Sequence, residues 1–190
     1  MKILVLDNYD SFTYNLVHLI ESIVDIRVEV YRNDTIDISY IKEFDTIFLS
    51  PGPGLPEEEG RMKEIIRLCH HSHKIFGVCL GMQAIAEVFG AKLKNLNTVF
   101  HGVAHEMYLP ESSHILFNGV PHRFLGARYH SWVVSMEDLP NELSVLCKDQ
   151  NDEIMALQYS NLPVCGVQYH PESILTEYGR EVISNFLFQM

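Results

Sequence analysis

The sequence predicts an α/β fold with a mostly parallel central sheet, helices on both faces and an antiparallel extension. Up to Gly90, short apolar runs rich in β-branched residues alternate with segments of helical spacing, which is typical of a parallel sheet covered by helices. From Ala91 onward short strands and turns follow one another, which predicts antiparallel pairing. The composition, 47% hydrophobic and 21% charged, is that of a globular domain with a sizeable core.

The first 90 residues alternate predicted strands with predicted helices. The strands are expected at residues 2–6, 27–31, 46–49 and 74–78. The helices are expected at residues 13–21, 58–69 and 82–89, and Gly90 ends the last of them. In the second helix apolar side chains recur at helical spacing, so one of its faces is expected to pack on the sheet.

The rest of the chain consists of predicted strands and one final helix. The strands are expected at residues 92–96, 104–109, 129–134, 143–147, 154–159 and 164–169, and the helix at residues 177–188. No repeat, low-complexity tract or linker divides the sequence. Residues 1–190 are therefore expected to form a single domain.

The charge of the chain argues against several classes of partner. Asp and Glu outnumber Lys and Arg by 25 to 14, so a chain with a net charge of −11 is expected to repel nucleic acid and anionic membranes. The apolar runs are far shorter than the ~20 residues that span a bilayer, and Asp7 comes too early for a signal peptide. Four cysteines without a CxxC spacing indicate a reducing compartment, so a cytoplasmic location is expected.

A candidate nucleophile, Cys79, lies between a predicted strand and a predicted helix. The segment Gly77-Val78-Cys79-Leu80-Gly81 has the G-x-C-x-G pattern of a nucleophile elbow, a sharp turn whose close backbone contacts leave no room for a Cβ at the glycines. The positive end of the helix dipole would favour the thiolate form of this cysteine. The alternative is a buried structural cysteine between two chance glycines.

The other cysteines and a histidine-rich segment are expected to be structural. Cys69, Cys147 and Cys165 lie in or at the end of apolar runs and are interpreted as small core residues. Residues 69–73, Cys-His-His-Ser-His, could hold a transition metal, but they end a predicted helix, where imidazoles interact favourably with the helix dipole. We therefore predict no metal site.

His170 and Glu172 form a candidate general base with its orienting carboxylate. Residues two apart in an extended chain face the same side, and Pro171 favours the extended conformation of His170. The carboxyl ends of parallel strands meet at one edge of a sheet, so the strands that precede Cys79 and His170 are expected to bring these side chains together. The alternative is an ordinary strand-to-turn segment with a solvated Glu172.

A third candidate element is the loop at residues 48–56, Phe-Leu-Ser-Pro-Gly-Pro-Gly-Leu-Pro, which follows a predicted strand. Proline has no N–H, so Gly52 and Gly54 are the backbone donors that the centre of this loop could offer to an oxyanion. The N–H of Leu80, directly after Cys79, is the expected second donor. The alternative is a Pro/Gly-rich turn without a binding role.

In this combination and order, the Cys79 elbow, the His-Pro-Glu segment and the Pro-Gly-Pro-Gly loop resemble the class I (triad) glutamine amidotransferases over essentially the whole chain. The family implies a flavodoxin-like α/β fold and the hydrolysis of glutamine to glutamate and ammonia through a cysteine thioester. Further segments resemble the branch that serves chorismate-using enzymes, namely anthranilate synthase component II and the glutaminase subunit of aminodeoxychorismate synthase. These segments are residues 7–16, 31–33, 101–102, 128–131 and 170–176.

The resemblance also implies roles for individual residues. By position, Cys79 corresponds to the nucleophile, His170 to the base and later acid, and Glu172 to the residue that orients His170. The glutamine site is implied to be lined by Gly52, Pro53, Gly54, Leu80, Gln83, Ser131 and Trp132, although Trp132 could instead be a core aromatic. Two positions depart from the branch, since Met82 replaces a more usual His and Val103 a more usual Lys. Neither departure touches the triad, and the second concerns contacts with a partner.

In this branch the ammonia passes to a partner protein, component I, which converts chorismate and is expected to carry its own Mg²⁺. No metal or organic cofactor is expected in the present subunit. The favoured interpretation is an anthranilate synthase subunit for tryptophan biosynthesis, and an aminodeoxychorismate synthase subunit for folate biosynthesis, or one subunit that serves both, is the alternative. A stand-alone γ-glutamyl hydrolase would need no partner, and residues 7–16 argue against it. The intact triad argues against an inactive regulatory module.

Overall fold

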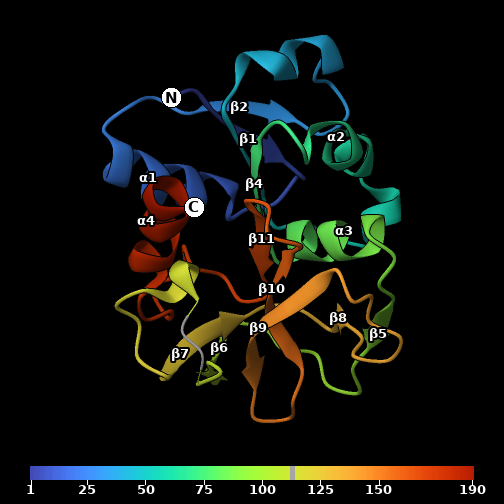
Figure 1. The fold of residues 1–190 in the computed structure, drawn as a ribbon, viewed down its shortest axis with the longest axis vertical. Helices are drawn as coiled ribbons and strands as arrows, with labels where there is room; N and C mark the ends of the chain where they lie inside the picture. The colour runs from blue at the N-terminus through green and yellow to red at the C-terminus, as the bar shows by residue number, and fades with distance from the viewer. Residues whose placement is uncertain (112–113) are drawn as a thin grey trace.

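The computed structural model describes residues 1–111 and 114–190. Its main feature is a nine-stranded sheet in the order β2-β1-β3-β4-β11-β10-β9-β6-β7, beside a small sheet formed by β5 and β8. Figure 1 shows the large sheet between helices. The α/β fold with a parallel centre and an antiparallel extension is therefore confirmed. Among the described residues, no helix is long and apolar enough to cross a membrane.

The large sheet has a parallel half and an antiparallel half. The parallel strands are β2 (Glu29–Arg32), β1 (Ile3–Asp7), β3 (Thr46–Leu49), β4 (Lys74–Val78) and β11 (Val164–Val167). The antiparallel strands are β10 (Ile154–Tyr159), β9 (Leu143–Asp149), β6 (Val103–Tyr108) and β7 (Arg123–Arg128). The small sheet pairs β5 (Leu93–Asn95) with β8 (Trp132–Val134).

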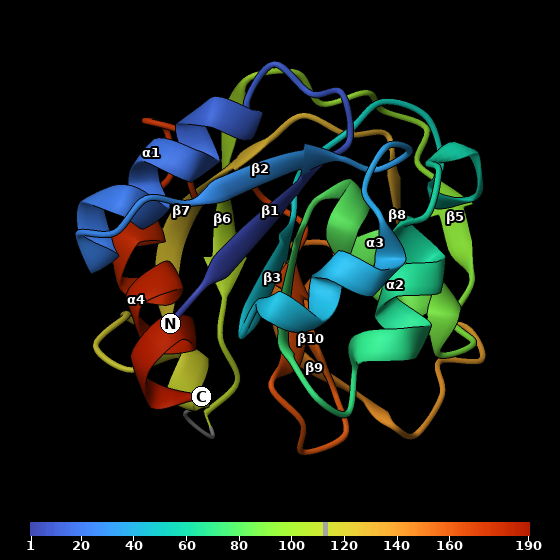
Figure 2. The same cartoon turned by 90° about the horizontal axis from the view of Figure 1, so that it is seen from above.

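Two pairs of helices cover opposite faces of the parallel half, as Figure 2 shows. One face carries α1 (Thr13–Val24) and α4 (Gly179–Gln189), and the other carries α2 (Met62–Cys69) and α3 (Leu80–Val88). Successive side chains of a strand point to opposite faces, so β1 places Ile3 and Val5 in the first core and Leu4 and Leu6 in the second. Burial on both faces explains why these strands read as continuous apolar runs.

Within the described residues, the connections contain the short 3₁₀ helices η1 (Ile38–Glu43), η2 (Pro56–Glu58) and η3 (Ile115–Phe117). The helix expected at residues 58–69 begins only at Met62, because Gly60, with a φ of +45°, interrupts the turn that follows η2. The single strand expected at residues 129–134 is also wrong. Its second half is β8, and the strand β7 precedes it.

The register between β4 and β11 places the site. Val78 pairs with Val167 in parallel, so the residues that follow them, Cys79 and Gln168, are neighbours at the carboxyl edge. The N–H of Cys79 donates to the carbonyl of Val167 at 2.8 Å. Gly166 lies beneath α3, where a Cβ would come within 2.6 Å of the carbonyl oxygen of Gly77. A glycine at this position therefore lets the helix that follows Cys79 lie directly on the two strands.

Candidate active site

Cys79 occupies a strained backbone turn between β4 and α3. Its φ of 52° and ψ of −104° are a combination that residues with a side chain rarely adopt. A Cβ on Gly81 would lie 2.5 Å from the carbonyl oxygen of Leu49, so the turn requires glycine there. The G-x-C-x-G segment therefore has the geometry of an elbow, with its thiol at the N-terminus of α3. The first N–H groups of this helix have no partner within it.

His170 and Glu172 form a buried pair next to this turn. His170 Nδ1 is 2.7 Å from Glu172 Oε1, and the two side chains are 2% and 0% exposed. The backbone of His170 is also held, because its N–H donates to Ala127 O at 3.0 Å and its carbonyl accepts from Thr176 Oγ1 at 2.5 Å. The alternative of a solvated Glu172 is therefore wrong.

The surroundings of His170 determine its protonation. Burial lowers the pKa of His170, but the hydrogen bonds and charges of Cys79 and Glu172 outweigh burial and raise this pKa to about 10. Nε2 makes no hydrogen bond of good geometry within the described residues, so we attribute the influence of Cys79 to its proximity. The rings of Phe12 and Tyr129 stand edge-on to the imidazole, with centroids 5.6 and 4.8 Å away. A protonated imidazole beside the Cys79 sulfur can act as a proton donor at neutral pH.

Gln168 donates to the sulfur of Cys79, although no motif in the sequence points to this residue. Its Nε2 is 3.4 Å from Cys79 Sγ, and the side chain is completely buried. Gln83 Nε2 in turn donates to Gln168 Oε1 at 3.1 Å and to the carbonyl of Trp132 at 2.9 Å. Gln83 and Trp132 are thus linked to the sulfur through Gln168. No local signal in the sequence reveals it, because the contact depends on the register between β4 and β11.

A buried ion pair lies next to the hydrogen-bonded group of Gln168, Gln83 and Trp132, and His130 connects the two. Arg128 Nη1 lies 2.6 Å from Asp149 Oδ2, and the two side chains are 0% and 1% exposed. Arg128 Nε donates to His130 Nε2 at 3.2 Å, and His130 Nδ1 lies 3.0 Å from the carbonyl of Trp132. Burial and the Arg128 charge lower the pKa of His130 to about 3, so this imidazole is neutral. Arg128 also lies 3.7 Å from the centroid of the Phe100 ring.

The predicted oxyanion loop lies against the start of α3. A Cβ on Gly52 would clash with the side chain of Leu80 and lie 2.8 Å from Asn8 Cβ, so Gly52 and Leu80, two of the predicted donor residues, are adjacent. Asn8 holds the loop, because its N–H donates to Ser50 Oγ at 2.9 Å and its Nδ2 to Ser50 O at 2.8 Å. Asn8 belongs to the segment 7–16 that resembles the chorismate-linked branch, and these bonds show that one residue of this segment holds the oxyanion loop in place.

The remaining predicted site residues surround this centre less closely. Pro53 and Gly54 are exposed on the loop, where Gly54 has a φ of +68°. Ser131 is half-buried and its carbonyl accepts from Leu96 N–H at 2.7 Å. In the described part of the chain, no hydrogen bond joins these three residues to the triad.

The two departures from the family branch lie at different depths. Met82 is completely buried on α3, and a Cβ built on Gly166 would lie 2.8 Å from its Cβ. Val103 is 39% exposed at the start of β6. Met82 therefore belongs to the core beneath the site, whereas Val103 lies at the surface.

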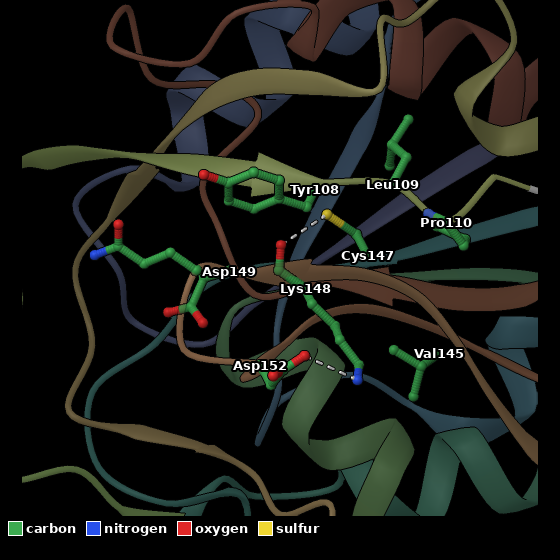
Figure 3. Close-up of a pocket in the computed structure, with 9 residues that line it drawn as sticks. Tyr108, Leu109, Pro110, Val145, Cys147, Lys148, Asp149 and Asp152 are labelled. Carbon is green, nitrogen blue, oxygen red and sulfur yellow. Dashed lines mark hydrogen bonds and ion pairs between the residues drawn. The ribbon is translucent and has the colours of Figure 1, made fainter.

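The other cysteines are buried free thiols, as predicted. Burial raises the pKa of Cys69 to about 11 and those of Cys147 and Cys165 further, so these thiols stay protonated at neutral pH. Cys147 also lines a hollow of about 500 Å³ beside β6 and β9, with Lys148, Asp152 and Tyr108 (Figure 3). Strand β9 is three positions from β4 in the sheet, and the lining includes none of the predicted site residues. The hollow is therefore separate from the Cys79 site.

The histidine-rich segment behaves as a helix end. His70 Nδ1 lies 2.9 Å from the carbonyl of Arg67 in the last turn of α2. Among residues 1–111 and 114–190, no group of three His, Cys, Asp or Glu side chains is arranged to hold a metal ion.

Comparisons with known proteins show the family of this chain. The sequence model of the family "Glutamine amidotransferase class-I" matches residues 4–190. A protein of Thermoplasma acidophilum, whose crystal structure is provisionally described as that of a GMP synthase subunit, superposes with a TM-score of 0.87. It is 25% identical to this chain, and the match covers 98% of this chain and 92% of that one.

Curated relatives cover nearly the whole chain. The chain is 41% identical to "Aminodeoxychorismate/anthranilate synthase component 2" of Bacillus subtilis, over 97% of this chain and 95% of that protein. It is 41% identical to "Anthranilate synthase component 2" of Mycobacterium tuberculosis, over 98% of this chain and 82% of that protein. It is 42% identical to "Bifunctional protein TrpGD" of Thermotoga maritima, over 98% of this chain but only 32% of that protein. The resemblance inferred from the motifs is confirmed, and the chain belongs to the class-I glutamine amidotransferase family.

Proposed function

We propose that this chain is the glutaminase subunit of an anthranilate synthase, which releases ammonia from glutamine for a chorismate-converting component I. The observation that carries the proposal is the buried His170–Glu172 pair next to Cys79 in its strained elbow. The identity of about 41% to component 2 proteins over nearly the whole chain supports the choice of partner.

In the proposed mechanism His170 holds the proton of the Cys79 thiol, and the thiolate attacks the amide carbon of glutamine. The N–H groups of Gly52 and Leu80 stabilise the oxyanion. Protonated His170 then gives its proton to the departing nitrogen, so that ammonia leaves and a γ-glutamyl thioester remains. Water attacks the thioester while His170 accepts its proton, and glutamate is released. Glu172 keeps the imidazole oriented and stabilises its charge. These steps require no metal or organic cofactor in this subunit.

An exposed apolar segment directly after the triad supports a protein partner. Ile174 is 99% exposed, and Leu175 and Tyr178 are 41% and 39% exposed. The segment is nevertheless anchored, because Thr176 Oγ1 accepts from Ala127 N–H at 2.9 Å and the N–H of Glu177 donates to Leu125 O at 2.8 Å. We propose that component I covers these apolar side chains, since anchored apolar surface beside a catalytic site is typical of a protein contact.

A partner at this position would solve a chemical problem. In water at neutral pH ammonia is mostly protonated and then cannot act as a nucleophile. Covering the site at the point where ammonia leaves would let it reach the second reaction unprotonated. In this proposal component I binds chorismate with its own Mg²⁺.

The second candidate function is the glutaminase subunit of an aminodeoxychorismate synthase, alone or in addition to the first. The name of the Bacillus subtilis relative joins the two synthases, and the match covers nearly the whole of both chains. The two functions are distinguished by the aromatic product that the chain supports with each type of component I.

The proposal is tested with Cys79→Ser in the reconstituted complex. We expect the glutamine-dependent rate to fall by roughly a thousandfold or more, because the nucleophile is lost, while the rate with added ammonium salt is unchanged. Chromatography of the product formed from chorismate identifies the synthase. Glutamine-dependent synthesis at the wild-type rate in the variant would reject the mechanism, and loss of the ammonium-dependent rate would indicate a disrupted complex instead.

A further inference from the structure

We propose that Gln168 is a further catalytic residue, which donates a side-chain N–H to the sulfur of Cys79 whenever this sulfur is a thiolate. Gln83 and the carbonyl of Trp132 act as positioning groups that set the orientation of the Gln168 amide. The inference rests on the proposed role of Cys79 as the nucleophile. It starts from the contact of 3.4 Å between Gln168 Nε2 and Cys79 Sγ, which is buried from solvent.

The contact results from the pairing of two neighbouring strands. Val167 of β11 lies opposite Val78 of β4, and Gln168 and Cys79 directly follow these two strand ends. The backbone of Gln168 is fixed as well, because its N–H donates to Met155 O on β10 at 2.9 Å. The amide is therefore held beside the sulfur by the sheet itself.

The hydrogen bonds determine which end of the Gln168 amide faces the sulfur. A backbone carbonyl can only accept, so the Trp132 oxygen requires the NH₂ group of Gln83, 2.9 Å away. The second hydrogen of this NH₂ group points to Gln168 Oε1 at 3.1 Å, which leaves Gln168 Nε2 directed at the sulfur. Turning the Gln168 amide over would place two NH₂ groups against each other and an oxygen against a thiolate.

The hydrogen bonds of Arg128 and His130 assign the same acceptor role to the Trp132 carbonyl. Arg128 can only donate, so its contact with His130 Nε2 at 3.2 Å makes that nitrogen an acceptor. His130 Nδ1 must then carry the hydrogen that points to the Trp132 carbonyl, 3.0 Å away. The Trp132 carbonyl thus accepts a hydrogen bond from Gln83 and another from His130. Neither side chain can exchange its donor for an acceptor there, because a carbonyl oxygen only accepts.

The Gln168 amide differs from the charged groups of the site because it carries no net charge. The titrating partners of the sulfur in the triad are His170 and Glu172, which form a pair at 2.7 Å. The ion pair of Arg128 and Asp149 is connected to Gln168 only through the neutral side chains of His130 and Gln83 and the Trp132 carbonyl, among the hydrogen bonds described above. The neutral Gln168 amide therefore gives the sulfur a donor that does not titrate.

A fixed donor at the sulfur would help at two stages. It raises the population of thiolate before the attack on glutamine, because hydrogen bonds to ionised acceptors are stronger than those between neutral groups. In thioester hydrolysis water adds to the carbonyl carbon, its proton passes to His170, and the C–S bond breaks. The sulfur leaves with the electron pair of that bond, and the Gln168 N–H stabilises it. We therefore expect an effect on kcat rather than on KM.

The test compares Gln168→Met with Gln158→Met. Methionine keeps the length of glutamine but has no N–H. Gln158 offers a matched control, because it is also buried and hydrogen-bonded, to Leu162 O and His114 Nε2 at 2.9 Å each, but it lies on β10. The rate of Cys79 alkylation by iodoacetamide is measured against pH by mass spectrometry of the Cys79 peptide, and kcat and KM for glutamine are measured in parallel.

In Gln168→Met we expect the alkylation midpoint to rise by about one pH unit, the equivalent of one hydrogen bond to a charged group. We also expect kcat to fall about tenfold with KM within about twofold, while Gln158→Met leaves the midpoint and kcat unchanged. Gln83→Met is the second variant, and it should move the midpoint in the same direction by less, since the Gln168 amide then loses only its orientation.

An unchanged midpoint and kcat in a folded Gln168→Met protein, or an equal shift in Gln158→Met, would overturn the inference. If Gln168→Met does not fold, an unchanged midpoint in Gln83→Met overturns it. The alkylation assay needs no glutamine turnover. A wild-type protein that is alkylated at Cys79 but does not hydrolyse glutamine would reject the proposed function and leave the role of Gln168 testable.

Discussion

Replacing Glu172 with glutamine removes one charge from the catalytic pair and leaves its shape almost unchanged. In the native protein Glu172 Oε1 is 2.7 Å from His170 Nδ1, and neither side chain is more than 2% exposed. Glutamine can present its own Oε1 to the same N–H, so the ring should keep its position. What is lost is the negative charge of Glu172, which together with Cys79 raises the pKa of His170.

The size of this effect follows from the short separation. Two unit charges about 4 Å apart interact by about 4 kcal/mol at an effective dielectric constant of ~20, which corresponds to roughly three pKa units. Although burial lowers it, the pKa of His170 is about 10 because Cys79 and Glu172 together raise it. Without the Glu172 charge we expect a pKa of roughly 7. At pH 8.5 the protonated fraction would fall from about 97% to about 3%.

The assay is the pH dependence of kcat/KM for glutamate release. If the imidazolium is the acid that protonates ammonia, activity falls as the pH rises through the pKa of His170. We expect this fall near pH 10 in the wild type and roughly three units lower in Glu172→Gln, with activity at pH 8.5 at least about tenfold lower. The control is Glu177→Gln, which changes a carboxylate outside the triad that accepts from Leu125 N–H at 2.9 Å. An unchanged alkaline limb in Glu172→Gln would refute the reasoning.

Two further predictions concern the buried imidazole of His130 and the proposed partner surface at Ile174. The pKa of His130 is about 3 in the folded protein against an ordinary 6.5, so below pH 6.5 the unfolded chain binds the extra proton, and stability is lost as the pH falls from 6.5 towards 3. Between pH 6.5 and 4.5 the wild type should therefore lose about 2–3 kcal/mol more of its free energy of unfolding in urea than His130→Asn, and equal losses would contradict this. Ile174→Asp should weaken binding of component I at least about tenfold, measured by calorimetry, with glutaminase activity of the free chain within about twofold, because an exposed side chain is changed. Leu68→Asp, at a 58% exposed residue of α2, is the control, and equal effects of the two changes would contradict a contact at Ile174.

The chemistry of the triad was predictable because each part is encoded locally. The glycines around Cys79 are required by backbone contacts within one turn and with the adjacent strand, and the His-Pro-Glu segment orients its own two side chains. Gln168 was not predictable in this way. Its role depends on the register between β4 and β11, which places it beside a residue 89 positions away.

The strand β7 shows the same limit in the fold. Its sequence, Arg-Phe-Leu-Gly-Ala-Arg, contains a glycine and two arginines, so it lacks the pattern of a buried strand. Gly126 is needed because a Cβ there would lie 2.9 Å from the side chain of Met107 and 3.0 Å from that of Tyr169. Arg128 can be buried because Asp149, on another strand, neutralises it.

The sequence by itself determined the alternation of strands and helices, the elbow at Cys79 and the local pairing of His170 with Glu172. These features follow from steric preferences and side-chain periodicity over a few residues. Only the tertiary structure decided which side chains meet across the sheet: Gln168 with the sulfur, Gln83 with the Trp132 carbonyl, and Arg128 with Asp149. Such contacts depend on strand register and on burial, which makes an unpaired polar group costly, and neither can be read from one short segment.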